Sequence, residues 1–431
     1  MFKLYYIVNA SYYLYKCINN NIKTEKEINN MLYYIDNSGC FFIKVVQSFI
    51  PRIEYTTNIN KNVKDKIMKY YENCSFHDIS YTKHIYKKEH LSELYDDYEI
   101  LDIIGSGSIA QVYRVKCKKT SNIFVLKITH PNLILDFYSF YLFYKILSYA
   151  FNLHKIIPIY NMDNSIKQLY DQTNLIHEVN NMCKLSSCTS EKLYIIPKVV
   201  KFSKNIIVMT YHKKSNYENL TYIKKRTIWL KLLLFTLGTG DYIGLSHCGL
   251  HSGNYSYLKE KIIIYDMGFC ATFVKSEFDL IFSLLLNNDK KKSIYAFIEF
   301  FNNKSYNKKN KINDLTEIHD FFENANDKEE IINTVKSVIK YIIKKNILIP
   351  TSIYNLLLVG NYFESNAGNV GIGNCHKSIH DKLTIGLNDI TNSYDIYKNV
   401  NDKIKPYLDK IKHEDFNKSN INFKKLKTKI I

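Results

Sequence analysis

The spacing of apolar residues divides the chain into a short strand-forming segment with helix-forming segments on both sides. β-branched and aromatic residues dominate three consecutive runs that glycine or polar turns separate, namely Tyr98–Ile104, Ile109–Val115 and Ile123–Ile128. These runs predict three strands joined by short turns. Two further apolar runs within Ile195–Thr210 predict additional strands.

Elsewhere apolar residues recur every three or four positions, which predicts helices over residues 1–85, over 165–188 and from Asn216 onward. The stretch Phe41–Ile50 is followed by Pro51, which predicts the end of a helix there. The apolar run Ile228–Gly240 contains Lys231 and is too short to span a bilayer, so we expect a buried helix.

The helical pattern after Asn216 is interrupted at two places. A glycine-rich loop followed by an apolar strand occupies Gly244–Gly268, and residues 303–313 form a polar stretch that predicts a loop. Beyond about residue 376 the pattern weakens and lysine becomes frequent, so we expect a tail without a core of its own.

A glycine-rich turn joins the first two predicted strands. The segment Gly105–Val112 follows the pattern GxGxx[GA]xV, in which the lack of bulky side chains lets backbone N–H groups approach phosphates. A tight hairpin turn would use the same glycines, so this segment alone does not decide for nucleotide binding. Its candidate binding residues are Gly105, Ser106, Gly107, Ser108 and Val112.

A lysine and a glutamate follow at spacings that suit a phosphate site. Lys127 ends the run FVLK on the third predicted strand, 22 residues after Gly105, and Glu178 lies in a predicted helix with the sequence HEVNNM. In protein kinases a strand lysine contacts the α- and β-phosphates and a helical glutamate holds it. Each of these residues, taken singly, is also compatible with an ordinary charge on the surface.

The strongest chemical signal runs from His247 to Gly268. The loop HCGLHSGN is followed by the apolar strand KIIIY and then by Asp266. Asn254 and Asp266 are 12 residues apart and separated by one hairpin strand, so both can reach Mg²⁺ as hard oxygen ligands. The alternative is an ordinary glycine loop and an aspartate at a strand end.

Taken together, these segments resemble the UbiB family of atypical kinases, which is tied to ubiquinone biosynthesis. The family carries a loop like AAASxxQV, a VAVK strand, an ExDxxxE helix, an HxDxHPGN loop and DFG. This chain has GSGSIAQV at 105–112, FVLK at 124–127, QTNLIHE at 172–178, HCGLHSGN at 247–254 and DMG at 266–268. Lys44-Val-Val-Gln47 stands in the place of the family's KxGQ, and KITHP at 127–131 resembles its KVxxP.

The resemblance implies an α+β, two-lobed protein-kinase-like fold that binds ATP and Mg²⁺. Lys127, Glu178 and Asp266 would serve catalysis, Asn254 and Asp266 would hold the metal, and backbone groups at Met209–Tyr211 would hold adenine. The expected parts are a helical N-terminal extension (1–85) with a KxxQ motif, a small β-rich N-lobe (86–213), a larger helical C-lobe (214–375) and a lysine-rich tail (376–431). The resemblance also implies a nucleotide as ligand, and a lipid substrate or a peripheral membrane contact.

The catalytic loop departs from the family pattern. Gly249 stands where the family has an aspartate that orients the nucleophile or accepts its proton. Loss of a positioned base typically costs about 10²–10⁴ in rate. His247 and His251 are the candidate substitutes for that base.

Two other family motifs are altered. The acidic pair of ExD becomes Gln172 and Asn174, which keep hydrogen-bonding capacity and lose the charge. In KxGQ, Val46 replaces the glycine, while Lys44 and Gln47 remain.

Composition limits the classes of partner. Hydrophobic residues make up 46% of the 431 residues, which is ample for a core, and the net charge is +18 with only three arginines. Proteins that recognise nucleic-acid phosphates and bases favour arginine, so we expect a solvated lysine surface and no specific nucleic-acid partner. The heavy use of Lys, Asn, Ile and Tyr is typical of an AT-rich genome, such as that of a large DNA virus or a parasite.

Two features bear on localisation. Nine cysteines without a CxxC pair predict reduced thiols in an intracellular protein, either cytoplasmic or peripheral to a membrane. The apolar N-terminus is interrupted by polar residues and lacks a small-residue cleavage pattern, which predicts neither a secretory signal nor a transmembrane helix.

Three functions stay open at this point. The chain is a UbiB-like ATP-binding protein with weak ATPase or phosphotransferase activity, or a pseudokinase that acts through partners as a nucleotide-binding or structural module. The third is a basic protein that has this fold but binds nucleic acid. The low arginine content disfavours this third function. Nucleotide binding is better supported than phosphoryl transfer.

Overall fold

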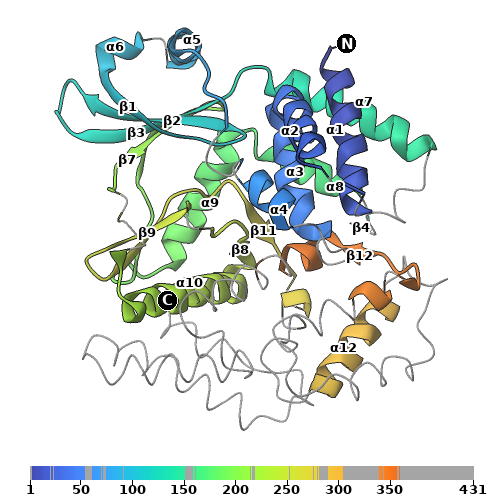
Figure 1. Ribbon diagram of the computed structural model, residues 1–431. Coiled ribbons are helices and arrows are strands. Elements are labelled where there is room, and N and C mark those ends of the chain that lie inside the picture. Colours follow the sequence, from blue (N-terminus) through green and yellow to red (C-terminus); the bar gives the residue numbers. More distant parts are fainter. Residues whose placement is uncertain are drawn as a thin grey trace. The chain divides into compact units, whose positions relative to one another are not determined.

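The computed structural model of the chain describes residues between 2 and 359 (Figure 1). Gaps in this description fall at 20, 23, 54–60, 69, 71–73, 91, 151–158, 161, 214, 216–218, 252, 275, 279, 281–289, 304–338, 343 and 357–358. The polar loop expected at 303–313 lies outside the described residues from 304 onward, and so does the lysine-rich tail. The chain divides into two compact units, Met1–Met182 with Pro197–Lys213, and Cys183–Ile196 with Lys214–Ile431.

The first unit contains a five-stranded sheet whose neighbours all pair antiparallel, in the order β1-β2-β3-β7-β6. The strands are β1 (Tyr98–Ser106), β2 (Ala110–Cys117), β3 (Ile123–Thr129), β6 (Val199–Phe202) and β7 (Ile206–Thr210). The three consecutive strands and the later apolar strands that the sequence predicts are confirmed, with small shifts at their ends.

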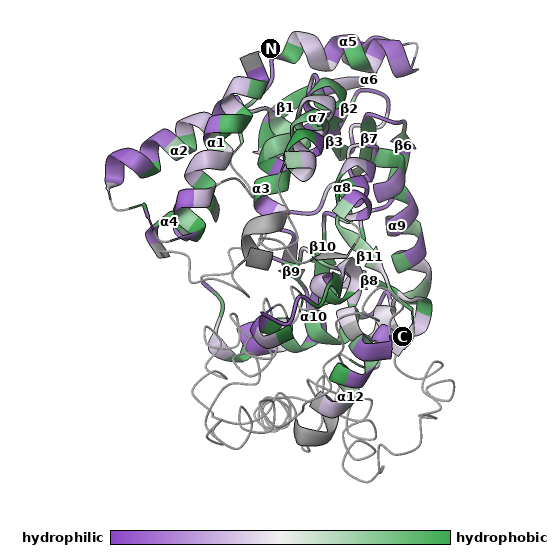
Figure 2. Cartoon of the chain, turned by 90° about the vertical axis from the view of Figure 1, so that its right-hand side faces the viewer, coloured by the Kyte–Doolittle hydropathy of each residue, from purple (hydrophilic) through white to green (hydrophobic). Residues whose placement is uncertain are grey.

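One face of this sheet is covered by helices. Tyr113 lies opposite Leu126, and Leu126 lies opposite Val208, so the three side chains share a face, where all are buried. They form a core with Tyr86 of α5 (Ile79–His90) and with Leu94 of α6 (Leu94–Asp97). Figure 1 shows α5 and α6 beside the sheet, and Figure 2 shows hydrophilic and hydrophobic residues alternating along α5.

The described residues of the N-terminal extension are mainly helical and form α1 (Phe2–Ile18), α2 (Glu25–Asn37), α3 (Cys40–Ile53) and α4 (Lys61–Met68). The first unit also contains α7 (Leu133–Ala150) and α8 (Met162–Asp171). The helix stop predicted at Pro51 was wrong, because α3 continues through this residue to Ile53. Proline lacks a backbone N–H and so removes one hydrogen bond from the helix, which can still continue for the two residues that remain before it ends.

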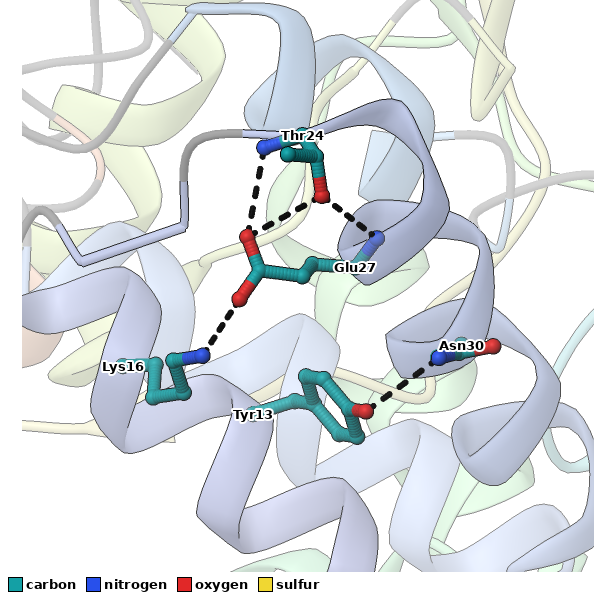
Figure 3. Close-up of polar contacts among 5 residues, drawn as sticks. All are labelled: Tyr13, Lys16, Thr24, Glu27 and Asn30. Carbon is teal, nitrogen blue, oxygen red and sulfur yellow. Dashed lines mark hydrogen bonds and ion pairs between the residues drawn. The ribbon is translucent and has the colours of Figure 1, made fainter.

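A capping box joins α2 to α1. Thr24 is the N-cap of α2; its Oγ1 accepts a hydrogen bond from the Glu27 N–H at 3.2 Å, and the Glu27 carboxylate accepts from the Thr24 N–H at 3.2 Å. The same carboxylate pairs with Lys16 of α1, and Asn30 donates to the Tyr13 hydroxyl at 3.2 Å (Figure 3). One glutamate therefore both starts α2 and fixes it to its neighbour.

Asp136 of α7 connects three helices. Its buried carboxylate pairs with Lys3 of α1 and accepts a hydrogen bond from the Cys40 N–H of α3 at 2.9 Å. Burial raises the pKa of Asp136, and these two partners oppose that rise. Gly39 approaches the carboxylate with a φ of +93°, and a Cβ there would overlap the carboxylate atoms.

The second unit contains short strands and a long buried helix. In one sheet β10 (Lys261–Ile264) pairs parallel with β5 (Tyr194–Ile195) and antiparallel with β9 (Tyr255–Leu258). In another, β11 (Cys270–Thr272) pairs with β8 (Leu245–His247). The second unit also contains the strand β12 (Ile349–Pro350) and the helices α10 (Tyr222–Ile243) and α12 (Lys290–Asn303). The strand β4 (Ile159–Tyr160) belongs to the first unit.

The predicted buried helix at 228–240 is confirmed within α10. Thr221 caps the start of α10 through its hydroxyl, and Gly244 ends the helix with a φ of 65°, a left-handed conformation that suits glycine. Its buried apolar side chains are Ile228, Trp229, Leu230, Leu232, Leu233 and Phe235. Among the helices that the structure describes, none combines the length and the apolar character needed to cross a bilayer.

Replacing Gly39 by alanine tests the contact with Asp136. We expect Gly39→Ala to lower the free energy of unfolding by about 1–3 kcal/mol, because the positive φ and the carboxylate both oppose a Cβ. Gly105→Ala is the matched control, since no atom lies within 4 Å of a Cβ placed there. Denaturant unfolding measures both variants, and equal stabilities would contradict the contact.

Candidate functional site

The third strand and α9 (Leu175–Cys188) bring two of the predicted residues together. Lys127 Nζ donates to both carboxylate oxygens of Glu178, at 2.8 Å to Oε1 and 2.7 Å to Oε2. The two residues are only 8% and 3% exposed, respectively. They therefore form a buried bidentate ion pair, and the alternative of two ordinary surface charges does not apply.

The start of α9 is fixed by a side chain and by the sheet. Asn174 Oδ1 accepts a hydrogen bond from the Ile176 N–H at 3.1 Å, which is the geometry of a helix N-cap. The Leu175 N–H donates to the Lys204 carbonyl at 2.9 Å, between β6 and β7. Asn174 occupies the second position of the altered acidic pair, and its amide serves to position the helix that carries Glu178.

The helix predicted over 165–188 is in fact two helices, α8 and α9, with the break at 172–174. Gln172 lies in this break, and its Nε2 donates to the Gln168 carbonyl at 3.2 Å. Its Oε1 is buried and has no hydrogen-bond partner among the described residues. An acidic side chain at this position would place a buried charge without a partner.

The lysine shares its face of the sheet with apolar residues. Val112 on β2 and Ile207 on β7 both lie opposite Lys127. Val125, two positions earlier on β3, and Met209, which lies opposite Val125, belong to the same face because side chains alternate along a strand. Val112 is partly exposed. Val112, Lys127 and Met209, three of the predicted binding residues, are thus on one face.

The predicted hinge lies at the end of β7. Met209 is within the sheet, between β3 and β6, whereas Tyr211 follows the last residue of the strand. The Arg114 guanidinium lies over the Tyr211 ring, 5.7 Å from its centroid, and forms a two-fold hydrogen-bonded pair with Asp102 at 2.8 and 3.0 Å.

The glycine-rich segment forms the turn between β1 and β2, where the Gly107 N–H donates to the Ala110 carbonyl at 3.0 Å. Both serines of this turn are buried, and their hydroxyls are used inside the protein. Ser106 Oγ donates to the Ser75 carbonyl at 3.2 Å, and Ser108 Oγ donates to Gln47 Oε1 at 2.8 Å. Only the backbone of these two serines is therefore available to a ligand.

Gln47 brings the KxxQ motif of the N-terminal extension to this turn. It lies on α3, is buried, and donates from Nε2 to the Tyr70 carbonyl while its Oε1 accepts from Ser108. Lys44 lies one helical turn earlier on the same side of α3. The expected family motif is thus in contact with the glycine-rich segment through its glutamine.

The second unit places the candidate metal ligands at the open end of a hairpin. Asn254 directly precedes β9, Asp266 follows β10, and the Tyr265 N–H donates to the Asn254 carbonyl at 2.9 Å. Both strands of the hairpin, rather than the one expected, separate the two residues. Asn254 Nδ2 donates to the Gly249 carbonyl at 2.8 Å, which leaves its Oδ1 without a partner among the described residues.

A buried lysine supports the closed end of the same hairpin. The turn residues Lys259 and Glu260 both have positive φ, 45° and 67°, as the tightest hairpin turns require. Lys231 of α10 donates from Nζ to the Glu260 carbonyl, and burial lowers the pKa of this lysine. The lysine predicted to interrupt an apolar helix thus holds the strained turn of the hairpin.

Comparison with protein families fits this geometry. Residues 66–295, more than half of the chain, match the family described as the ABC1 atypical kinase-like domain. The chain belongs to this family. The matched residues include the Lys127–Glu178 pair, the glycine-rich turn and the β9–β10 hairpin. A search of curated proteins found no match.

Membership of the ABC1 atypical kinase-like family agrees with the two-lobed α+β fold predicted from the sequence. It makes the chain a protein with an atypical kinase fold. The narrower resemblance to UbiB proteins and the viral origin stay predictions.

His247, a predicted catalytic residue, is enclosed in this ABC1 domain. Its Nδ1 accepts a hydrogen bond from the Gly249 N–H at 3.0 Å, so its Nε2 carries the proton and donates to the Asp266 carbonyl. Burial lowers the pKa of His247, and the residue is 1% exposed. Both ring nitrogens are engaged, so the ring holds the loop and offers no free nitrogen to a substrate as a base.

Gly249 leaves room where the family has an aspartate. A Cβ at this position would meet His247 Cε1 at 3.7 Å, Phe269 Cδ1 at 3.7 Å and Asn254 Nδ2 at 3.8 Å, which are ordinary contact distances. Gly249 is not among the residues with positive φ. The backbone at Gly249 therefore leaves room for a Cβ.

The remaining loop residues set the metal environment. Asp266 Oδ1 accepts a hydrogen bond from the Gly268 N–H at 2.7 Å, and His251 Nδ1 accepts from the Gly253 N–H at 3.2 Å. Within the described part of the chain, no group of three or more His, Cys, Asp or Glu residues is placed to hold a metal. A metal at the hairpin would take oxygens from Asn254 and Asp266.

A double-mutant cycle tests the Lys127–Glu178 pair. We expect Lys127→Met or Glu178→Leu alone to lower the free energy of unfolding by about 3–5 kcal/mol, because each removes the bidentate partner of a buried charge, and the double variant to lose much less than the sum. Urea unfolding measures the cycle.

The exposed pair Lys145–Asp163, at 2.9 Å with side chains 46% and 50% exposed, is the control and should couple by less than about 1 kcal/mol. Additive losses at Lys127 and Glu178 would contradict the buried pair.

Proposed function

We propose that this ABC1-family chain binds ATP·Mg²⁺ and has only weak ATPase or phosphotransferase activity. The observation that carries the proposal is the buried bidentate pair of Lys127 and Glu178. Such a pair adds little to stability compared with apolar side chains, because burying two charges costs several kcal/mol. A lysine held charged beside a glycine-rich turn is explained better by a phosphate ligand.

The first unit supplies groups that suit the base and the phosphates. Val112, Val125 and Met209 offer an apolar face beside Lys127, and the partial exposure of Val112 leaves surface for an aromatic ring. The glycine-rich turn offers backbone N–H groups, since its serine hydroxyls are used elsewhere. These features support Gly105, Gly107 and Lys127 as the phosphate-binding residues.

The second unit supplies oxygens that suit Mg²⁺. Asn254 Oδ1 lacks a partner among the described residues, and Asp266 lies across the open end of the hairpin from it. Hard oxygen ligands of this kind fit Mg²⁺, which would neutralise charge on the phosphates when bound. The kinase-like family assignment supports ATP·Mg²⁺ as the ligand of this chain.

Phosphoryl transfer is expected to be slow. Gly249 provides no base, and His247 uses both ring nitrogens on backbone groups. These observations favour a second candidate function, a pseudokinase in which nucleotide binding or the fold itself serves a partner protein. The neutral Gln172 and the use of Asn174 as a helix cap also favour it.

Restoring the aspartate separates the two candidates. We expect Gly249→Asp to bind ATP·Mg²⁺ as tightly as the native chain and to hydrolyse ATP about 10²–10⁴ times faster, because the loop accepts the side chain. Fluorescent-nucleotide titration and phosphate release measure the two quantities, and the double variant Gly249→Asp/Asp266→Asn is the control. Tight binding without any gain in turnover favours the pseudokinase, and no binding in either chain contradicts both.

We also propose a peripheral contact with an anionic lipid bilayer, through α7. Its side chains Leu135, Tyr138, Leu142, Ile146 and Tyr149 recur every three or four residues and are 53–96% exposed. The only acid on this helix, Asp136, is buried and paired. An apolar, tyrosine-containing stripe without exposed acids on a chain of net charge +18 suits an anionic surface.

Co-sedimentation with vesicles tests this contact. We expect the native chain to sediment with vesicles that contain phosphatidylserine, and Leu142→Glu/Ile146→Glu to reduce the bound fraction at least about fivefold. Val200→Glu/Phe202→Glu changes two residues of β6 with similar exposure, 55% and 49%, and is the matched control. An equal loss of vesicle binding in both double variants would contradict a contact through α7, because the added negative charge alone would then explain the loss.

A further inference from the structure

A chain of buried hydrogen bonds connects the start of α5 to the glycine-rich turn. His130, directly after β3, lies 2.8 Å through Nε2 from the Gly107 carbonyl. Its Nδ1 lies 2.9 Å from His77 Nδ1, and His77 Nε2 lies 2.9 Å from Thr82 Oγ1. Thr82 Oγ1 in turn lies 2.8 Å from the Tyr113 hydroxyl.

The direction of every bond in this chain follows from one carbonyl. The Gly107 oxygen only accepts, so His130 Nε2 carries the proton and, in the neutral ring, His130 Nδ1 accepts. His77 Nδ1 must then donate, which leaves His77 Nε2 to accept from the Thr82 hydroxyl. The Tyr113 hydroxyl therefore donates to Thr82.

Gln111 closes the network at both ends. Its Nε2 donates to the Tyr113 oxygen at 2.6 Å, and its Oε1 accepts from the His77 N–H at 2.8 Å. The neighbouring turn residue Ser106 also lies within reach of the His130 ring, with Oγ 3.3 Å from Nε2. Every member of the chain is satisfied when both histidines are neutral.

We propose that His77 is a positioning residue for the glycine-rich turn: by donating to His130 it fixes the tautomer that holds the Gly107 carbonyl. This inference rests on the proposed nucleotide site, because the turn matters to function only if it binds phosphates. The side chain of His77 acts on the Gly107 carbonyl through His130.

Protonation of His77 breaks the far end of this network. Its Nε2 would then carry hydrogen and donate to Thr82, and the buried Tyr113 hydroxyl would be left without an acceptor, while the bond from His77 to His130 and the hold on Gly107 stay in place. Burial and the neighbouring His130 lower the pKa of His77 to about 4, and burial lowers that of His130. The other groups that face His77 are Asp78, which opposes this lowering, and the rings of Tyr81 and Tyr113.

Because the pKa of His77 in the folded chain lies below its unfolded value of about 6.5, the neutral arrangement is complete above that value. It is lost progressively as the pH falls from about 6.5 toward about 4. The stability that the neutral network contributes to the folded chain follows the same window.

Two quantities test the proposal: the amide hydrogen-exchange rate of residues 105–110 in the ligand-free chain, and the dissociation constant for ATP·Mg²⁺. We expect His77→Leu to raise the exchange rate and the dissociation constant at pH 7.5 by about five- to tenfold each, the effect of one lost hydrogen bond. His77→Asn keeps an N–H donor near the position of Nδ1 and should restore both to within about twofold. Tyr113→Phe removes a hydroxyl from the far end of the chain and should lower stability while leaving both unchanged.

Equal effects of His77→Leu and Tyr113→Phe on exchange and affinity would overturn the proposal, since His77 would then act only on stability. If His77→Leu fails to fold, His77→Ala, which also removes the donor to His130, takes its place. Exchange of residues 105–110 in His77→Ala that equals exchange in the native chain would also overturn the proposal. Absence of nucleotide binding in the native chain would refute the proposed function, while the exchange result would still test the positioning by His77.

Discussion

The buried ion pair between Lys127 and Glu178 is the constraint on which the surrounding structure depends. Two charges that are 8% and 3% exposed remain stable only if each stays within hydrogen-bonding distance of the other. The register of the sheet fixes the lysine, and the Asn174 cap with the Leu175–Lys204 hydrogen bond fixes the helix that carries the glutamate. Much of the first unit therefore serves to hold one ammonium group beside the glycine-rich turn.

The glycine-rich turn is itself held from the N-terminal side. Gln47 accepts from the Ser108 hydroxyl, the Cys74 N–H donates to the Ser106 carbonyl at 2.9 Å, and His77 reaches Gly107 through His130. The hydroxyls of Ser106 and Ser108, two of the predicted binding residues, point into the protein and bond to Ser75 and Gln47. The N-terminal extension thus contributes to the shape of the candidate phosphate-binding turn, although it precedes the first strand in the chain.

The sequence predicted the elements whose signal is local. Runs of β-branched and aromatic residues between turns predicted the strands of the sheet, and the spacing between Gly105, Lys127 and Glu178 predicted a pair that the structure brings together. Contacts between distant segments could not be predicted, because no local pattern marks them; Gln47 and Ser108 are 61 residues apart. The enclosure of His247 and the capping role of Asn174 also depend on neighbours that only the folded chain supplies. Pro51 shows that a local signal can also mislead, because the helix predicted to stop at this proline continues to Ile53.

The central claim is that the chain binds ATP·Mg²⁺, and thermal unfolding with and without ATP·Mg²⁺ tests it most directly. A ligand present at about 100 times its dissociation constant stabilises the folded state by roughly 2.7 kcal/mol. We predict a Mg²⁺-dependent rise of the unfolding midpoint in the native chain that Lys127→Ala and Asp266→Asn both abolish. No rise at near-millimolar ATP, or an equal rise in all three chains, would contradict the claim.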